Sequence, residues 1–153
     1  MASVPGWLAA ARGANTRAIT SLVVHCSATR EGQHFDAADI RDWHKRQGWS
    51  DIGYHFVVLL DGTVEPGRPI GKIGGHVAGH NATTIGICYI GGVAADGKTP
   101  KDTRTVAQKA ALLQILGELK QRYPAADVCG HRDFPKVAKA CPSFDARREY
   151  AAL

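Results

Sequence analysis

The sequence has no long apolar run, few cysteines and no recognisable secretory leader. No apolar segment approaches the roughly 18 residues that a membrane-spanning helix needs, so we expect no insertion into a membrane. Four cysteines in 153 residues are sparse for a secreted disulfide scaffold, so we expect free thiols, with metal ligation as the alternative. The first dozen residues lack both a basic start and a long apolar core, which predicts synthesis into the cytoplasm.

The charge balance is moderately basic. Lysine and arginine total 19 against 14 acidic residues, a net charge of +5, and 44% of the residues are hydrophobic. This composition is that of a globular domain with a preference for anionic partners such as nucleic acid, phospholipid headgroups or a bacterial cell wall. The basic residues are scattered and form no recognised nucleic-acid motif, so we expect no direct binding to nucleic acid.

The order of local patterns predicts one α/β domain. Residues 1–18, interrupted by two glycines and an asparagine, are expected to form a loosely ordered arm before a domain over residues 19–153. Within that domain we expect a central mixed β-sheet flanked by helices. The predicted elements are a strand at 19–26, a helix capped by Asp36, a hairpin turning at residues 61–62, a strand at 84–90, a helix starting after Thr105, a strand at 127–129 and a helix at 142–150.

The helix after Thr105 shows a broad apolar face. One ridge is expected from Val106, Ala110, Leu113 and Leu116, widened by Leu112, Ile115 and Leu119. This face would cover the sheet.

Two histidines and one cysteine suggest a metal site. His25 and His131 end predicted strands that can lie side by side, and Cys141 lies in a proline-flanked loop. Two imidazoles and one thiolate leave a fourth position for water, which is the catalytic form of a zinc site. We therefore predict a zinc site in a surface groove at the strand ends.

Other histidines and cysteines receive different interpretations. Strand alternation turns Cys26 toward the core if His25 faces the groove, and it favours Tyr54 over His55 for the groove. His76, in the glycine-rich loop 71–79, is either a substrate contact or an exposed loop histidine. His44 is expected to be packed and hydrogen-bonded; Cys88 and Cys129, like Cys26, are expected to be inert buried thiols.

Six segments in order carry a family resemblance. The chain resembles the zinc N-acetylmuramoyl-L-alanine amidases of bacteriophages, the amidase-type phage lysozymes, which share a superfamily with peptidoglycan-recognition proteins. In that family the positions matching His25, His131 and Cys141 hold one Zn²⁺, and those matching Tyr54 and Lys139 are needed for catalysis. The segments are 24–29 (VHCSAT), 43–49 (WHKRQGW), 51–56 (DIGYHF), 61–65 (DGTVE), 85–88 (IGIC) and 139–145 (KACPSFD).

The resemblance implies a peptidoglycan hydrolase that cuts the amide between N-acetylmuramic acid and L-alanine. Such an endolysin is made in the host cytoplasm and reaches the cell wall after the membrane is permeabilised; we expect a monomer. One alternative is a module that binds peptidoglycan without cutting it, although relatives of that kind lack the cysteine ligand that Cys141 would supply. A second alternative is an additional activity, the inhibition of a phage RNA polymerase.

Overall fold

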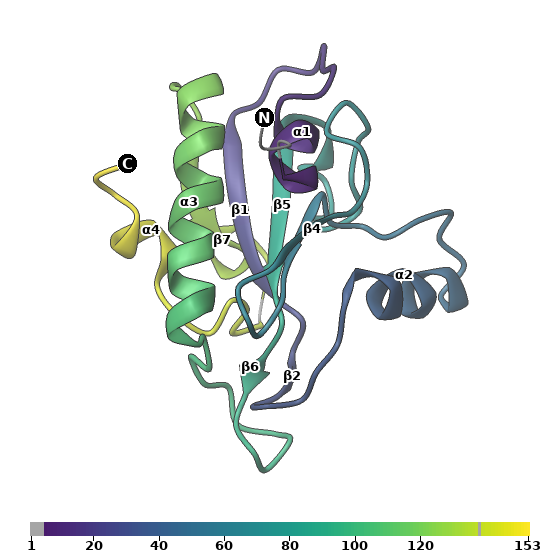
Figure 1. Ribbon diagram of the computed structural model, residues 1–153, viewed down its shortest axis with the longest axis vertical. Coiled ribbons are helices and arrows are strands. Elements are labelled where there is room, and N and C mark those ends of the chain that lie inside the picture. The colour runs from purple at the N-terminus through teal and green to yellow at the C-terminus, as the bar shows by residue number, and fades with distance from the viewer. Residues whose placement is uncertain (1–4, 138) are drawn as a thin grey trace.

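The centre of the molecule is a mixed β-sheet (Figure 1). The computed structural model describes residues 5–137 and 139–153, and five strands follow the order β4-β3-β5-β1-β7. The pairs β3–β5, β5–β1 and β1–β7 are parallel, whereas β3–β4 is the antiparallel hairpin that the turn at 61–62 predicts. The strands are β1 (Ser21–Cys26), β3 (Phe56–Val58), β4 (Val64–Pro66), β5 (Thr84–Tyr89) and β7 (Asp127–Gly130); a small parallel pair joins β2 (Thr29–Arg30) and β6 (Gly92–Val93).

Helices flank the sheet, and the two longest begin where their caps predict. Asp36 and Thr105 each form a capping box with the residue three positions on, which satisfies backbone N–H groups that the first turn leaves free. The helices are α1 (Gly6–Ala11), α2 (Ala37–Arg46), α3 (Val106–Arg122) and α4 (Ala146–Glu149), with 3-10 turns at Asn81–Thr83 and His131–Asp133. The predicted α/β architecture is confirmed. No helix among the described residues is both long and apolar enough to cross a bilayer.

Strand alternation divides the core into two sides. Val24 and Cys26 of β1 pack into the cluster that includes the buried leucines of α3, whereas Val23 belongs to a different cluster. On the side away from α3, Ile40 of α2 packs with Val57 of β3 and with Cys88 of β5. This arrangement places His25, one residue from Cys26, on the sheet face that α3 does not cover.

Helix α3 is rotated relative to the predicted ridge. Val106 is 86% exposed and Leu113 is also exposed, so that part of the prediction is wrong. Gln108 is fully buried instead, and its side-chain amide donates to the carbonyls of Val58 and Ile90. Gln108 faces the sheet because it satisfies these two carbonyls, and this contact sets the rotation of α3. The spacing of hydrophobic residues alone does not reveal such a contact.

The N-terminal residues contain more structure than the loosely ordered arm that was expected. Helix α1 packs on α3 and β4, and Ala11 is buried in the main core cluster. Its alanines favour a helix, and Arg122 donates a hydrogen bond to the Ala11 carbonyl at 2.8 Å. The division into residues 1–18 and 19–153 stays a prediction.

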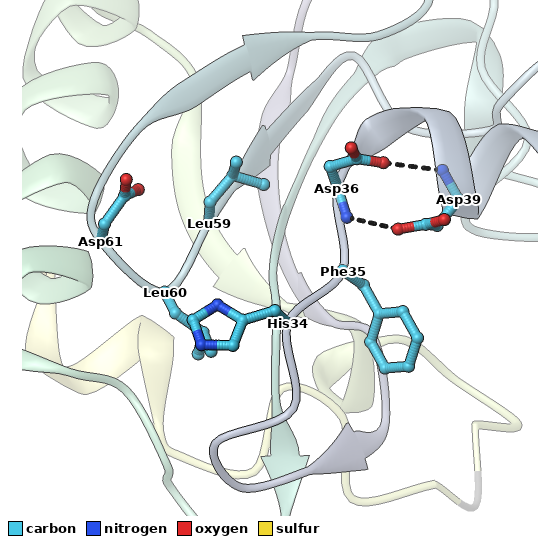
Figure 2. Close-up of a pocket in the computed structure, with 7 residues that line it drawn as sticks. All are labelled: His34, Phe35, Asp36, Asp39, Leu59, Leu60 and Asp61. Atoms are coloured by element: carbon cyan, nitrogen blue, oxygen red, sulfur yellow. Dashed lines mark hydrogen bonds between the residues drawn. The ribbon is translucent and has the colours of Figure 1, made fainter.

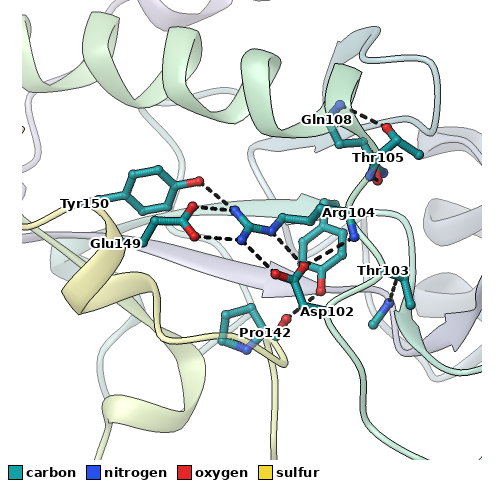
Figure 3. Close-up of polar contacts among 10 residues, drawn as sticks. Asp102, Thr103, Arg104, Thr105, Gln108, Pro142, Glu149 and Tyr150 are labelled. Carbon is teal, nitrogen blue, oxygen red and sulfur yellow. Dashed lines mark hydrogen bonds and ion pairs between the residues drawn. The ribbon is translucent and has the colours of Figure 1, made fainter.

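A buried arginine ties the segment before α3 to the C-terminal segment (Figure 3). The Arg104 side chain is 1% exposed, and its guanidinium donates to the carboxylates of Asp102 and Glu149 and to the Tyr150 hydroxyl. The guanidinium carbon also lies 3.4 Å from the centroid of the Phe144 ring. Arg104 therefore holds the chain that follows Cys141 against the rest of the domain.

We predict that Arg104→Met lowers the free energy of unfolding by about 2 kcal/mol, measured by chemical denaturation. The expected cost is smaller than that of stranding fully buried charges, because Asp102 and Glu149 are 32% and 44% exposed and remain hydrated. The control is Arg147→Met, which removes two exposed ion pairs, with Asp127 and Asp133, and should change stability by less than about 0.5 kcal/mol.

The difference between wild type and Arg104→Met should also depend on pH. Hydrogen bonds from Arg104 lower the pKa of Glu149 below its ordinary 4.5. A depressed folded-state pKa contributes stability above the unfolded pKa and loses it as pH falls through the folded value. The wild-type advantage should therefore shrink below pH 4.5, and an advantage that grows with acid would contradict the assignment.

Candidate metal centre and active-site groove

His25, His131 and Cys141 lie together, as predicted. Strand β1 pairs with β7 in parallel, with Val24 opposite Gly130, so the next residues of both strands emerge at the same edge of the sheet. One ligand atom from each of the three residues lies within 4.8 Å of the others. The His25 Nδ1 atom is 3.9 Å from the Cys141 sulfur, and the rings of His25 and His131 have centroids 4.7 Å apart. This group can bind a metal ion.

Backbone hydrogen bonds place the Cys141 thiol. The N–H of Cys26 donates to the Cys141 sulfur at 3.2 Å, and the N–H of Arg132 donates to the Cys141 carbonyl at 2.8 Å. The next residue is held as well, because the Tyr89 hydroxyl donates to the Pro142 carbonyl at 2.6 Å. These hydrogen bonds fix the position of Cys141 in its loop, as the strands fix the positions of the two histidines.

Burial keeps His25, His131 and the neighbouring His76 uncharged at neutral pH. Desolvation, assisted by neighbouring imidazoles, lowers the pKa of His25 and of His76 well below 6.5. Burial also lowers the pKa of His131, with a secondary contribution from the charge of Lys139. Neutral imidazoles are the form that ligates metals.

A groove of about 410 Å³ is lined by His131 and Cys141, and His25 is buried beside them. Tyr54 lines it with its ring centroid 5.0 Å from that of His25, and burial raises the pKa of the Tyr54 phenol well above 10. Lys139 lines another part of the groove and is exposed. His55, by contrast, is buried outside the groove lining, so the alternation argument selected the residue that faces the groove.

His76 differs from the exposed loop histidine that was one expectation. It is 8% exposed, and its Nδ1 atom lies 2.8 Å from His25 Nε2. Because it also borders the groove, a substrate contact at His76 stays a prediction. The observed contact is with the His25 ring.

Sequence reasoning missed the wall of the groove formed by α2 and the residues after it. Trp43, Gln47 and Trp49 all line the groove. Trp43 and Gln47 are one helical turn apart and so share a face, which is the signal that could have identified this wall. His44 is hydrogen-bonded, as expected, through its Nδ1 atom to the N–H of Gly53 at 2.9 Å, but it borders the groove too.

A separate hollow of about 250 Å³ lies at the start of α2 (Figure 2). Its Asp36 and Asp39 carboxylates accept hydrogen bonds from each other's backbone N–H groups, at 2.9 and 3.0 Å. These two carboxylates therefore cap the helix, and His34 beside them has no part in the metal group.

Fold and site together define an α/β domain with a two-histidine, one-cysteine group that can bind a metal ion beside an open groove, the donor types of a catalytic metal site. Residues 15–144 match the model of the N-acetylmuramoyl-L-alanine amidase family. The chain belongs to this amidase family, and the function expected from the sequence is confirmed at that level.

Individual relatives support the same family assignment. The chain is 46% identical over 129 residues to an endolysin of Klebsiella phage KP32, covering 84% of this chain and 83% of the relative. It is 43% identical over 128 residues to an endolysin of Escherichia phage T7, with coverage of 84% and 83%. Among solved structures, an endolysin N-acetylmuramoyl-L-alanine amidase from Clostridium intestinale superposes with a TM-score of 0.71 at 29% identity, covering 86% of this chain and 80% of that one.

The thiols should differ sharply in reactivity. Burial raises the pKa of Cys88 well above 9, and it raises that of Cys129 to about 12. A hydrogen bond between the thiols of Cys26 and Cys141 lowers the pKa of Cys26 to about 7 and raises the pKa of Cys141, so a thiolate in this pair lies on the buried Cys26. Because a reagent must also reach the sulfur, a short pulse of a thiol reagent on the native metal-free protein should modify Cys141, which is half-buried and lines the groove, before the buried Cys88 or Cys129.

Mass spectrometry of the digested protein measures the order of modification, and labelling in denaturant, where all cysteines react, provides the control. Modification of Cys88 or Cys129 as fast as Cys141 in the folded protein would contradict the assigned environments.

Proposed function

We propose that this amidase is a zinc-dependent endolysin that cleaves the amide between N-acetylmuramic acid and L-alanine in peptidoglycan. The observation that carries the proposal is the approach of His25, His131 and Cys141 within 4.8 Å of one another, with His131 and Cys141 lining an open groove. Membership of the amidase family supplies the reaction class. The net charge of +5 suits an anionic cell wall.

The residues present fit one Zn²⁺. Two neutral imidazoles and a thiol are donors that zinc prefers, and three protein ligands leave a position open toward the groove. When bound, zinc supplies Lewis acidity for the scissile carbonyl and lowers the pKa of water to near 7.

Lys139 is proposed to stabilise charge. Hydrolysis of an amide builds negative charge on the carbonyl oxygen, and a cationic or hydrogen-bonding group beside that oxygen lowers the barrier. Lys139 lines the groove two residues before Cys141 and influences His131 electrostatically. Its ammonium has no free lone pair, so it is not a ligand.

Tyr54 is proposed to act as a hydrogen-bond donor. Because burial raises the pKa of its phenol well above 10, the proton stays on Oη at neutral pH and the group is unsuited to act as a base. From the groove wall its hydroxyl can donate to the attacking water's oxygen or to the leaving amine nitrogen.

The cellular role follows the same proposal. The phage relatives carry the name endolysin, and we infer that this protein acts on the cell wall from the cytoplasmic side once the membrane is permeabilised. The cysteine in the metal group favours hydrolysis over a module that only binds peptidoglycan. A monomeric state and inhibition of a phage RNA polymerase stay predictions.

Removing a ligand should remove both metal and activity. We expect Cys141→Ala to lose stoichiometric zinc and hydrolysis, because two imidazoles alone hold the ion weakly. Zinc content by elemental analysis and the release of new amino groups from purified peptidoglycan measure the two effects. Cys88→Ala, which changes a buried thiol outside the metal group, is the matched control; a Cys141→Ala protein that retains zinc would refute the ligand set.

Lys139→Ala and Tyr54→Phe should separate catalysis from metal binding. Each is expected to keep one zinc and a normal melting temperature while turnover falls by roughly 100-fold, the usual cost of losing one electrostatic contact in a transition state. Lys136→Ala, an exposed lysine in the same loop that does not line the groove, should retain full turnover. Wild-type turnover in both groove variants would refute the mechanism.

A further inference from the structure

Behind the metal group, three buried side chains form a continuous chain of hydrogen bonds, which we call the relay. The Thr84 hydroxyl oxygen lies 2.8 Å from the carbonyl of His80 and 3.2 Å from His76 Nε2. His76 Nδ1 lies 2.8 Å from His25 Nε2. Thr84, His76 and His25 are all buried.

The carbonyl at the end of this chain determines where each hydrogen lies. A carbonyl oxygen only accepts, so the Thr84 hydroxyl donates its single hydrogen to His80. Thr84 must then accept from His76, which places the His76 hydrogen on Nε2 and leaves its Nδ1 as an acceptor. His25 consequently donates from Nε2 to His76, and its Nδ1 lone pair is free, 3.9 Å from the Cys141 sulfur.

We propose that His76 and Thr84 are positioning residues that fix the tautomer and ring orientation of His25, so that its Nδ1 atom is always presented as the metal ligand. The inference deepens the proposed function and rests on the zinc site described there. Without the relay, a neutral imidazole could carry its hydrogen on Nδ1, where it would block ligation.

Neighbouring residues make room for the His76 ring. A Cβ atom at Gly86 would lie 2.7 Å from His76 Cγ, and one at Gly74 would lie 2.8 Å from His76 Cδ2. Neither glycine has the positive φ that requires glycine for conformational reasons, so the requirement at both is space. Asn81 in turn accepts hydrogen bonds from the backbone N–H groups of His76 and Val77, at 2.9 and 2.8 Å, which holds the loop in place.

The tautomer of His25 can be read directly in the metal-free wild-type protein. Long-range proton–nitrogen correlation NMR distinguishes protonated from bare ring nitrogens. We expect both His25 and His76 to carry the hydrogen on Nε2 and to have an unprotonated Nδ1. A His25 protonated on Nδ1 would overturn the proposal, and this measurement requires neither zinc nor any variant.

Zinc affinity provides the second test. Thr84→Val removes the hydroxyl with little change of shape and should weaken zinc binding roughly 10-fold, measured by competition with a chelator, because outer partners of metal ligands typically contribute 10- to 100-fold. Thr84→Ser restores the hydroxyl and should recover the affinity. Thr83→Val is the matched control, since the Thr83 hydroxyl pairs with Thr20 outside the relay.

The two proposals fail in different ways. Affinity within twofold of wild type in a folded Thr84→Val protein would overturn the relay while leaving the zinc amidase intact. A wild-type protein that binds no zinc would instead contradict the proposed function, and the NMR result would still decide the tautomer. If Thr84→Val does not fold, the wild-type tautomer remains the deciding observation.

Discussion

The parallel pairing of β1 with β7 is the constraint on which the site depends. Because Val24 lies opposite Gly130, His25 and His131 leave the sheet at the same level and on neighbouring strands. A shift of one residue in either strand would turn its following side chains to the other face of the sheet. The buried residues of β1 prevent such a shift, since Val24 and Cys26 pack with the α3 side and Val23 packs elsewhere. The spacing of these two histidines is therefore set by the packing of the hydrophobic core.

The third member of the metal group requires a different explanation, because Cys141 lies in a loop. Its backbone is bound to Arg132, and its neighbour Pro142 is bound to the hydroxyl of Tyr89 on β5. Further along, Phe144 lies under the guanidinium of Arg104, whose ion pairs join α4 to the segment before α3. Cys141 and Phe144 also pack with the main core cluster, so polar contacts and packing together order this loop, as the sheet orders the histidines.

The sequence predicted the features that depend on local chemistry or on strand direction. The caps at Asp36 and Thr105, the hairpin at 61–62 and the meeting of His25 with His131 all follow from residue type and order. Features that depend on one buried polar contact were not predicted. Gln108 rotates α3 by binding two strand carbonyls, and helical periodicity carries no signal for that contact. Helix α1 was missed because its order comes from packing on α3 and β4.

His76 shows how a missed feature nevertheless leaves a trace in the sequence. Glycine in the middle of a strand weakens it, and it often marks a place where another group approaches the backbone closely. Gly86 is such a glycine, on β5 between Ile85 and Ile87, and the group that approaches is the His76 ring. Hydrogen bonds at both ring nitrogens hold the orientation of this imidazole, and Thr84 on the same strand assigns its hydrogen. Strand β5 thus contributes no member of the metal group, yet it orients one: its glycine admits the His76 ring, its threonine sets the tautomer, and His25 receives both constraints through a single 2.8 Å contact.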